Sequence, residues 1–303
     1  MNNLNTNIKS DFLDNFTLIE NYDSGKNKLK FYCPIIDANE FSYEGLVRSL
    51  RSAASHYCLS RRTYEEYKDN PMELSYEVRE KFRKFESNTG ELGELMMFSF
   101  LESDLNAPKI LTKMELKTNP NNYFNGADGV HYLKLSDGNY QLIFGESKAH
   151  DDLLKGFKAA IDSISKFKNN KIKDDDTGQL RGITFEKSLL NAHLSEETFN
   201  NEEREFIKSI IYPKSGNKFN VDTAFGVFIL YNSEFDPTKK DLSNSDYRTY
   251  IYDELKNAIS EAIPKICSHI NSKKMNGHCF YIYIVPFEEL SKNRKDILKE
   301  AIS

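Results

Sequence analysis

Residues 126–150 read GADGVHYLKLSDGNYQLIFGESKAH, and this stretch decides the fold that we expect for the chain. Two short apolar runs, 129–135 and 140–145, have the composition of β-strands. Between them lies Ser136-Asp137-Gly138-Asn139, whose Asp-Gly pair is a strong signal for a hairpin turn. The stretch therefore predicts two antiparallel strands, followed by a helix from about residue 151 to 167.

The type of turn decides which side chains of the hairpin share a face. Glu146 and Lys148 are two positions apart on one strand, so they project from the same face. If a three-residue loop begins at Ser136, with Gly138 in the left-handed conformation, Asp128 lies directly opposite Glu146. A two-residue turn would send Asp128 to the other face, unless a bulge compensates. A site that uses all three side chains requires the three-residue loop or the bulge.

Asp128, Glu146 and Lys148 have the chemistry of a metal-dependent nuclease. Carboxylate oxygens suit Mg²⁺ and Mn²⁺, so Asp128 and Glu146 are predicted to hold the metal ion. Lys148 would orient the water nucleophile or neutralise charge that builds up on the phosphate. The acidic-x-Lys pattern alone is weak, since Glu115-Leu-Lys117 also matches it. The hairpin context favours catalysis over the alternative, a structural hairpin with a surface ion pair.

A helix predicted at about residues 91–102 offers a further carboxylate. Its apolar residues must be largely buried, and Glu91 and Glu94 share a face because they are three positions apart. We expect Glu94 to be an additional metal or water ligand, with Glu91 as the other choice. The alternative is that both acidic residues favour the positive end of the helix dipole.

Histidines and lysines lie close to these residues in the sequence. His131 and His150 are each either a contact to nucleic acid or a packing or surface histidine. Lys155 and Lys158 follow on the predicted helix, where they either track a nucleic-acid backbone or form a solvated face. The basic segment continues with Lys166, Lys168, Lys171 and Lys173.

The rest of the chain alternates strands and helices, which predicts an α/β fold with a mixed central sheet flanked by helices. We expect residues 1–85 to form a smaller, partly helical N-terminal region that is a candidate for partner docking, and residues 86–303 to form a nuclease-like domain. The first 25 residues are expected to be a loosely ordered lead-in. Further strands are predicted at 28–36, 109–117, 224–231 and 279–285, helices at 42–58, 72–85, 247–271 and 287–302, helical segments around 185–211, and loops at 119–125 and 168–178.

Composition places the chain among globular proteins. It has 303 residues, a formal net charge of −5 and no apolar run near the roughly 20 residues of a membrane-spanning helix. The start lacks the features of a secretory signal, so no membrane association and a cytoplasmic location are expected. The acidic balance argues against coating of nucleic acid by bulk electrostatics. The four cysteines lie far apart, so we expect free thiols and no zinc site.

Three short motifs follow one another along the chain. They are Gly90-Glu-Leu-Gly-Glu-Leu95, Gly126-Ala-Asp-Gly-Val-His131 and Phe144-Gly-Glu-Ser-Lys-Ala-His150. In this order and spacing they resemble the HamA-like nuclease subunits of Hachiman anti-phage defence. The resemblance covers the chain from about residue 40 to the end.

The resemblance implies a PD-(D/E)xK-type nuclease fold in which Asp128, Glu146 and Lys148 are catalytic and Glu94 or Glu91 is the helix glutamate. It also implies a metal-dependent DNA nuclease that a partner helicase, HamB, holds inactive. Release would follow when the helicase senses phage-induced or damaged DNA. Cleavage would then stop phage replication.

Two other functions compete with this interpretation. A non-catalytic subunit would keep the nuclease fold and serve to dock a helicase or to recognise DNA, but such a role does not require the three core side chains. A stand-alone restriction enzyme would need its own sequence-reading element, and the sequence offers none. The chain has no Gly-x-x-x-x-Gly-Lys-Ser/Thr loop, so any ATP-driven step must come from another chain.

Overall fold

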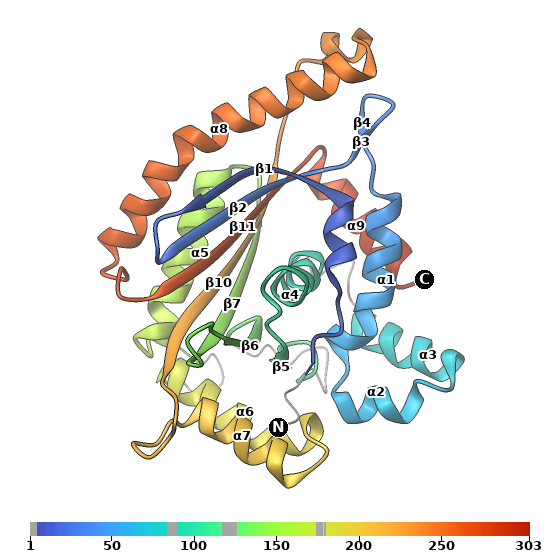
Figure 1. The fold of residues 1–303 in the computed structure, drawn as a ribbon. Helices are drawn as coiled ribbons and strands as arrows, with labels where there is room; N and C mark the ends of the chain where they lie inside the picture. The colour runs from blue at the N-terminus through green and yellow to red at the C-terminus, as the bar shows by residue number, and fades with distance from the viewer. Residues whose placement is uncertain (1–4, 84–89, 117–125, 174–177, 179) are drawn as a thin grey trace.

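The computed structural model of this chain describes residues 5–83, 90–116, 126–173, 178 and 180–303. In this part of the chain seven strands form one mixed sheet, in the order β1-β2-β11-β10-β7-β6-β5 (Figure 1). The central strands β7, β10, β11 and β2 are parallel to one another, whereas β1, β6 and β5 pair antiparallel with their neighbours. The strands are β1 (Phe16–Asp23), β2 (Asn27–Pro34), β5 (Lys109–Thr112), β6 (Gly129–Lys134), β7 (Tyr140–His150), β10 (Val221–Asn232) and β11 (Cys279–Phe287).

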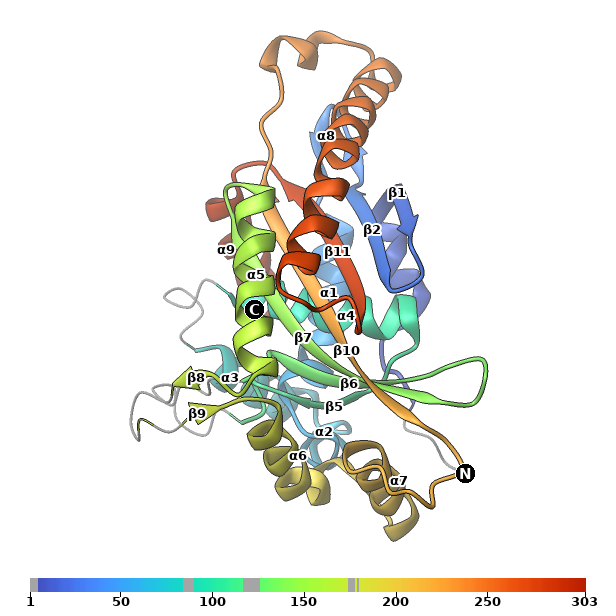
Figure 2. The same cartoon turned by 90° about the vertical axis from the view of Figure 1, so that its left-hand side faces the viewer.

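Helices cover both faces of the sheet, which confirms the predicted fold class. One face carries α5 (Leu153–Lys168) and α8 (Asn244–Ser272), which lie in front of the strands in Figure 2. The opposite face carries α4 (Glu91–Leu105), with α1 (Glu44–Cys58) and α9 (Leu290–Ala301) packed outside it.

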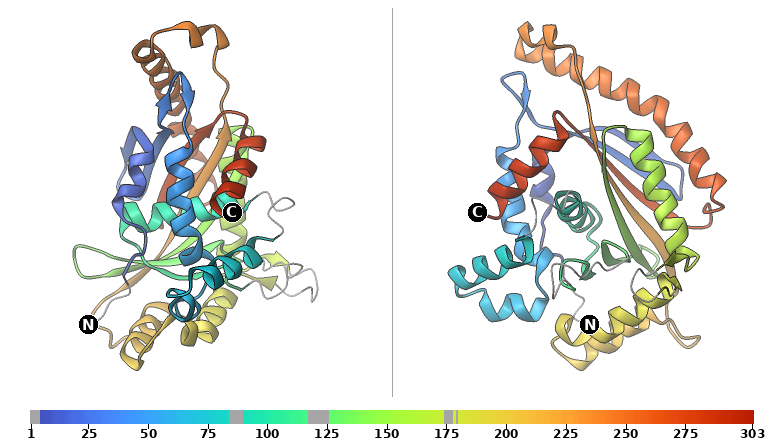
Figure 3. Two further views of the ribbon diagram at one scale, coloured as in Figure 1. Left: turned by 90° about the vertical axis from the view of Figure 1, so that its right-hand side faces the viewer. Right: turned by 180° about the vertical axis from the view of Figure 1, so that it is seen from behind.

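The remaining helices lie around the margin of the sheet. Helix α6 packs against β5, and α7 contacts β7, so both lie near the β5–β6 edge (Figure 3). Their bounds, with those of the smaller elements, are α2 (Arg61–Tyr67), α3 (Pro71–Phe82), α6 (Ile183–Glu197), α7 (Asn201–Ile211), η1 (Ser10–Asn15), η2 (Pro237–Asp241), β3 (Ile36–Asp37), β4 (Glu40–Phe41), β8 (Ile172–Lys173) and β9 (Leu180–Arg181).

Burial explains why the central elements are apolar throughout. Residues 224–231 of β10 are all buried, because this strand has neighbours on both edges and helices on both faces. Helix α4 is buried from residue 91 to 103 and lies between the sheet and the outer helices. The predicted strands and helices are confirmed, most with small shifts at their ends, although the strand predicted at 140–145 continues to His150. The strand predicted at 109–117 is shorter, since β5 ends at Thr112.

The expectation that the first 25 residues form a loosely ordered lead-in is wrong. They contain η1 and β1, and β1 pairs with β2 along its length. Because β1 is an edge strand with one neighbour, several of its side chains are polar and partly exposed, which hides the strand pattern in the sequence. Phe16 of β1 is buried against Tyr32 and Phe100, so this segment belongs to the core.

Strands β1 and β2 come from the predicted N-terminal region, yet they extend the same sheet as β7 and β10. The predicted boundary at residue 85 lies in 84–89, outside the described residues. The same holds for the loop predicted at 119–125. Within the described ranges, no helix is both long and apolar enough to span a membrane.

Candidate active site

The turn between β6 and β7 has the three-residue form that the catalytic interpretation requires. Gly138 has a φ of +87°, and the Leu135 N–H donates to the Asn139 carbonyl at 2.8 Å. The strands pair in the corresponding register, with Gly129 opposite Gly145. Continuing this register by one residue brings Asp128 opposite Glu146, as predicted.

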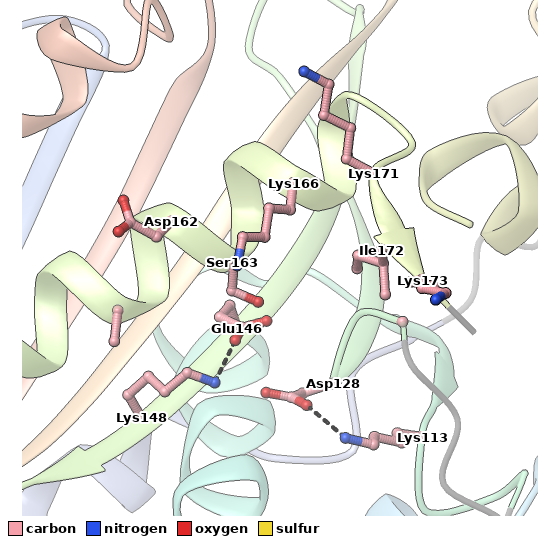
Figure 4. Close-up of a pocket in the computed structure, with 12 residues that line it drawn as sticks. Lys113, Asp128, Glu146, Lys148, Asp162, Ser163, Lys166, Lys171, Ile172 and Lys173 are labelled. Atoms are coloured by element: carbon pink, nitrogen blue, oxygen red, sulfur yellow. Dashed lines mark hydrogen bonds and ion pairs between the residues drawn. The ribbon is translucent and has the colours of Figure 1, made fainter. Parts of the chain in front are cut away.

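Asp128, Glu146 and Lys148 line one open cavity of about 690 Å³ (Figure 4). Strand β7 supplies the second and third, and Asp128 lies immediately before β6. One wall comes from α5, where Ala159, Ser163 and Lys166 are spaced so that they share a helix face. The other lining residues are Lys113, Gly126, Asp162, Lys171, Ile172 and Lys173.

Asp128 is held by two donors. It is 6% exposed, its Oδ2 accepts the Ser147 N–H at 2.8 Å, and its Oδ1 lies 3.4 Å from the Lys113 Nζ. The backbone bond ties the aspartate to β7, so the hairpin fixes the distance between Asp128 and Glu146. The lysine comes from the turn that follows β5.

Glu146 is buried beside a second negative charge. Burial raises the pKa of its carboxyl, and the charge of Asp128 raises it further; Lys148 and the hydrogen bond from Ser163 oppose this shift. The Lys148 Nζ lies 2.5 Å from Glu146 Oε1, with the lysine side chain 37% exposed. Each of the two carboxylates is thus paired with one lysine.

The donor set suits a hard divalent cation that keeps part of its water shell. The pKa of Glu146 is raised first by burial and then by repulsion from Asp128, and a shared cation would relieve that repulsion. Mg²⁺ commonly takes only one or two carboxylates and completes its shell with water and substrate oxygens. Among the described residues, no group of three or more His, Cys, Asp or Glu is arranged to hold a metal ion.

Glu94 lies outside the residues that line the cavity. Helix α4 covers the sheet face opposite α5, and the Glu94 Oε2 accepts the hydroxyl of Tyr57 at 2.9 Å. The pKa of Tyr57 is raised by burial and then by Glu94, Glu91 and Asp128, so each of these carboxylates lies close enough to Tyr57 to act on it. The role of Glu94 or Glu91 as a ligand stays a prediction.

His131 is a core residue, which corrects its tentative assignment to nucleic-acid binding. It is 0% exposed, its Nδ1 lies 2.8 Å from the Ala107 carbonyl, and burial lowers its pKa to about 4. Its ring packs against Phe98. His150 ends β7 and accepts the Asp152 N–H at its own Nδ1, away from the cavity lining.

The basic segment divides into two groups. Lys166, Lys171 and Lys173 line the cavity, whereas Lys155 and Lys158 are exposed on α5 and are not among its lining residues. The first group therefore lies nearest to the carboxylates. The loop predicted at 168–178 contains β8, which pairs with β9 and carries Lys173.

The competing acidic-x-Lys match has a structural role at its acidic end. Glu115 forms a buried ion pair of 2.5 Å with Lys109, whose Nζ also donates to the backbone carbonyls of His56 and Leu59. Glu115 is not among the lining residues, and Lys117 lies outside the described residues. Of the two acidic residues, only Glu146 lines the cavity.

Three neighbours of the carboxylates were not predicted from the sequence. Lys113 pairs with Asp128, Ser163 hydrogen-bonds to Glu146, and Glu186 of α6 lies beside the segment that carries Asp128. Glu186 is 4% exposed, and burial raises its pKa to about 7, with Lys113 opposing the shift. Of these three, only Ser163 could have been found from local spacing, because it shares a face of the α5 helix with Ala159 and Lys166.

Close approach explains two glycines of the motifs. A Cβ on Gly93 would lie 2.4 Å from the Ser147 Oγ, and one on Gly145 would lie 2.6 Å from the Met97 Cε. Glycine at both positions lets α4 pack tightly on β7, next to the backbone N–H that holds Asp128.

Comparison with known proteins gives one family. A family model described as HamA matches residues 8–301, which is nearly the whole chain. No curated protein matches the chain.

Proposed function

The chain belongs to the HamA family of Hachiman anti-phage defence proteins, and on this premise we propose that it is a metal-dependent DNA endonuclease. It would act as the effector subunit of a defence complex, held inactive by a partner helicase of the HamB type. The observation that carries the proposal is the register of the hairpin: it brings Asp128 next to Glu146 and Lys148 in one open cavity.

Each side chain of the site has a definable task. Asp128, fixed by the Ser147 N–H, and Glu146 would hold Mg²⁺ or Mn²⁺. When bound, the ion would polarise the phosphate and lower the pKa of a water molecule. Lys148 is partly exposed, so it can leave Glu146 to orient the nucleophilic water or to neutralise charge on the phosphate.

The positive charge of the lysines that line the cavity favours a polyanionic substrate. Lys113, Lys166, Lys171 and Lys173 all line the cavity, and in Figure 4 the last three lie above Lys113, so a nucleic-acid backbone passing the carboxylates would meet positive charge. Lys155 and Lys158 would extend this contact along α5. The net charge of −5 makes tight binding of free DNA by this chain alone unfavourable.

A helicase partner would supply what this chain lacks. The sequence has no phosphate-binding loop of the ATPase type, so unwinding or translocation must come from another subunit. Such a partner could also deliver DNA to the cavity when it meets phage-induced or damaged DNA. Restraint by the partner would keep the nuclease from cutting host DNA.

The test is cleavage of supercoiled plasmid by the purified chain with Mg²⁺, Mn²⁺ or EDTA. We expect metal-dependent cutting that falls about a hundredfold or more in Glu146→Ala and in Lys148→Ala. The matched control is the exposed ion pair of α7, changed by Glu205→Ala and Lys208→Ala, which should cut like the wild type.

Equal cutting by the site variants and the wild type would refute the assignment of the site. If no protein cuts, the assay is repeated with the helicase partner present. Cutting only then would indicate activation by the partner. No cutting in either case, together with no binding of Mn²⁺, would favour a non-catalytic docking subunit.

A further inference from the structure

Glu186 is a buried carboxylate that lies against the segment carrying Asp128, although the two are far apart in the sequence. It is in the first turn of α6, whose N-terminal end is anchored by the bond from the Thr184 N–H to Asn170 Oδ1. The Glu186 carboxylate accepts a hydrogen bond from the Ala127 N–H. It therefore contacts the backbone one residue before Asp128.

Gly126 shows how closely the carboxylate approaches this segment. A Cβ added at Gly126 would lie 2.3 Å from the Glu186 Oε2 and 3.1 Å from its Cδ. No side chain fits there without displacing the carboxylate. The glycine that opens the Gly126-Ala-Asp128 motif is therefore explained by contact with Glu186.

Lys113 links the two acidic residues electrostatically. It pairs with Asp128 Oδ1 at 3.4 Å, and its charge also acts favourably on the Glu186 carboxylate. The Asp128 segment thus has support from three directions: the Ser147 N–H of β7, the lysine that follows β5, and Glu186 of α6. The backbone of Asp128 is also held, since its N–H donates to the Gly145 carbonyl and its carbonyl accepts the Lys113 N–H, whereas Glu186 holds the preceding residue, Ala127.

We propose that Glu186 is a positioning residue for Asp128: as a hydrogen-bond acceptor for the Ala127 N–H, it keeps Asp128 opposite Glu146 across the cavity. The consequence of this positioning for catalysis rests on the proposed function. Residues that orient ligand-bearing groups from outside a metal site commonly change metal affinity by about 10- to 100-fold. Glutamine retains an acceptor oxygen, whereas alanine does not.

The experiment compares Glu186→Ala, Glu186→Gln and, as a control on the exposed face of the same helix, Glu196→Gln. Hydrogen exchange of the metal-free protein measures protection of the segment 126–131. Electron paramagnetic resonance measures binding of Mn²⁺ without DNA, and plasmid cleavage gives kcat and KM. Gly126→Ala is a second route to the same change, because its Cβ displaces the carboxylate while Glu186 remains.

We expect Glu186→Ala and Gly126→Ala to lose protection of the segment, to bind Mn²⁺ about tenfold or more weakly, and to lower kcat with little change in the KM for DNA. Glu186→Gln should remain close to the wild type in all three. Unchanged protection and Mn²⁺ binding in Glu186→Ala would refute the inference. Equal impairment of the Gln and Ala variants would also refute it, since the acceptor would then not be the cause.

The two proposals fail in different ways. If the wild type binds no Mn²⁺ and cuts no DNA, with or without a helicase, the proposed function fails. The positioning of Asp128 by Glu186 is then still decided by hydrogen exchange of the metal-free protein. If the wild type is active and Glu186→Ala behaves like it, the proposed function stands and the positioning role is refuted.

Discussion

Asp128 and Glu146 illustrate how much of a site depends on what surrounds each residue. Both are buried carboxylates at the end of the same hairpin, yet one accepts a backbone N–H while the other pairs with a partly exposed lysine. Burial and mutual repulsion raise the pKa of Glu146, and a bound cation would reverse that effect. Under the proposed function, the bound cation would compensate the negative charge of both carboxylates.

His131 gives a prediction at the scale of a single residue. Burial holds its pKa at about 4, below the ordinary value of 6.5, so the unfolded state binds the proton more tightly than the folded state. Stability from neutral His131 is complete above pH 6.5 and is lost as the pH falls toward 4. Lowering the pH from 7 to 5 should therefore lower the free energy of unfolding by about 2 kcal/mol through this residue.

The measurement is urea unfolding of the wild type and of His131→Phe across this range of pH. The variant loses the bond to the Ala107 carbonyl at every pH, but its stability should fall less steeply toward pH 5. Parallel curves for the two proteins would contradict the prediction.

At the scale of elements, the contact between α5 and α6 decides where Glu186 lies. Gly182 immediately precedes α6, and a Cβ there would lie 2.2 Å from the Phe167 carbonyl oxygen and 2.7 Å from the Asn170 Cα. Both are backbone atoms, so the clash cannot be relieved by turning a side chain. Helix α6 can approach α5 this closely only because residue 182 is glycine.

We therefore expect Gly182→Ala to lower the free energy of unfolding by about 1–3 kcal/mol. Cleavage should also fall, because movement of α6 carries Glu186 away from the Asp128 segment. The control is Gly216→Ala, since nothing lies within 4 Å of a Cβ at that position. Chemical denaturation and plasmid cleavage measure the two effects, and equal stability of the two variants would contradict the argument.

At the scale of the whole molecule, the N-terminal strands belong to the same sheet as the hairpin of β6 and β7. Phe31 of β2 is 0% exposed and stacks on Tyr231 of β10, with ring centroids 6.3 Å apart. A residue of the predicted N-terminal region thus packs in the core of the predicted nuclease domain. This contact favours a single cooperative unit.

Phe31→Ala should consequently destabilise the entire protein by about 3–5 kcal/mol and keep a single unfolding transition. Leu18→Ala in β1 is the control, because Leu18 is 45% exposed and its truncation should cost little. Circular dichroism and tyrosine fluorescence would follow the transition. A separate early transition that alone responds to Phe31→Ala would mean that the N-terminal region unfolds independently.

The sequence by itself determined the features that local patterns encode. Alternation and the Asp-Gly turn predicted the hairpin, the spacing of two placed Glu146 and Lys148 on one face, and the apolar runs predicted the buried strands and α4. These signals are local, because strand and helix periods act over neighbouring residues. The edge strand β1 was missed since it has only one neighbour to bury it.

Only the tertiary structure decided which distant groups surround the carboxylates. The three-residue turn was one of two choices until the strands were paired, and the burial of His131 against Phe98 followed from the packing of α4. Lys113 approaches Asp128 from the turn after β5, and Glu186 of α6 lies against the segment that carries Asp128. Contacts across such separations leave no periodic trace in the sequence, because chain folding, not spacing, brings them together.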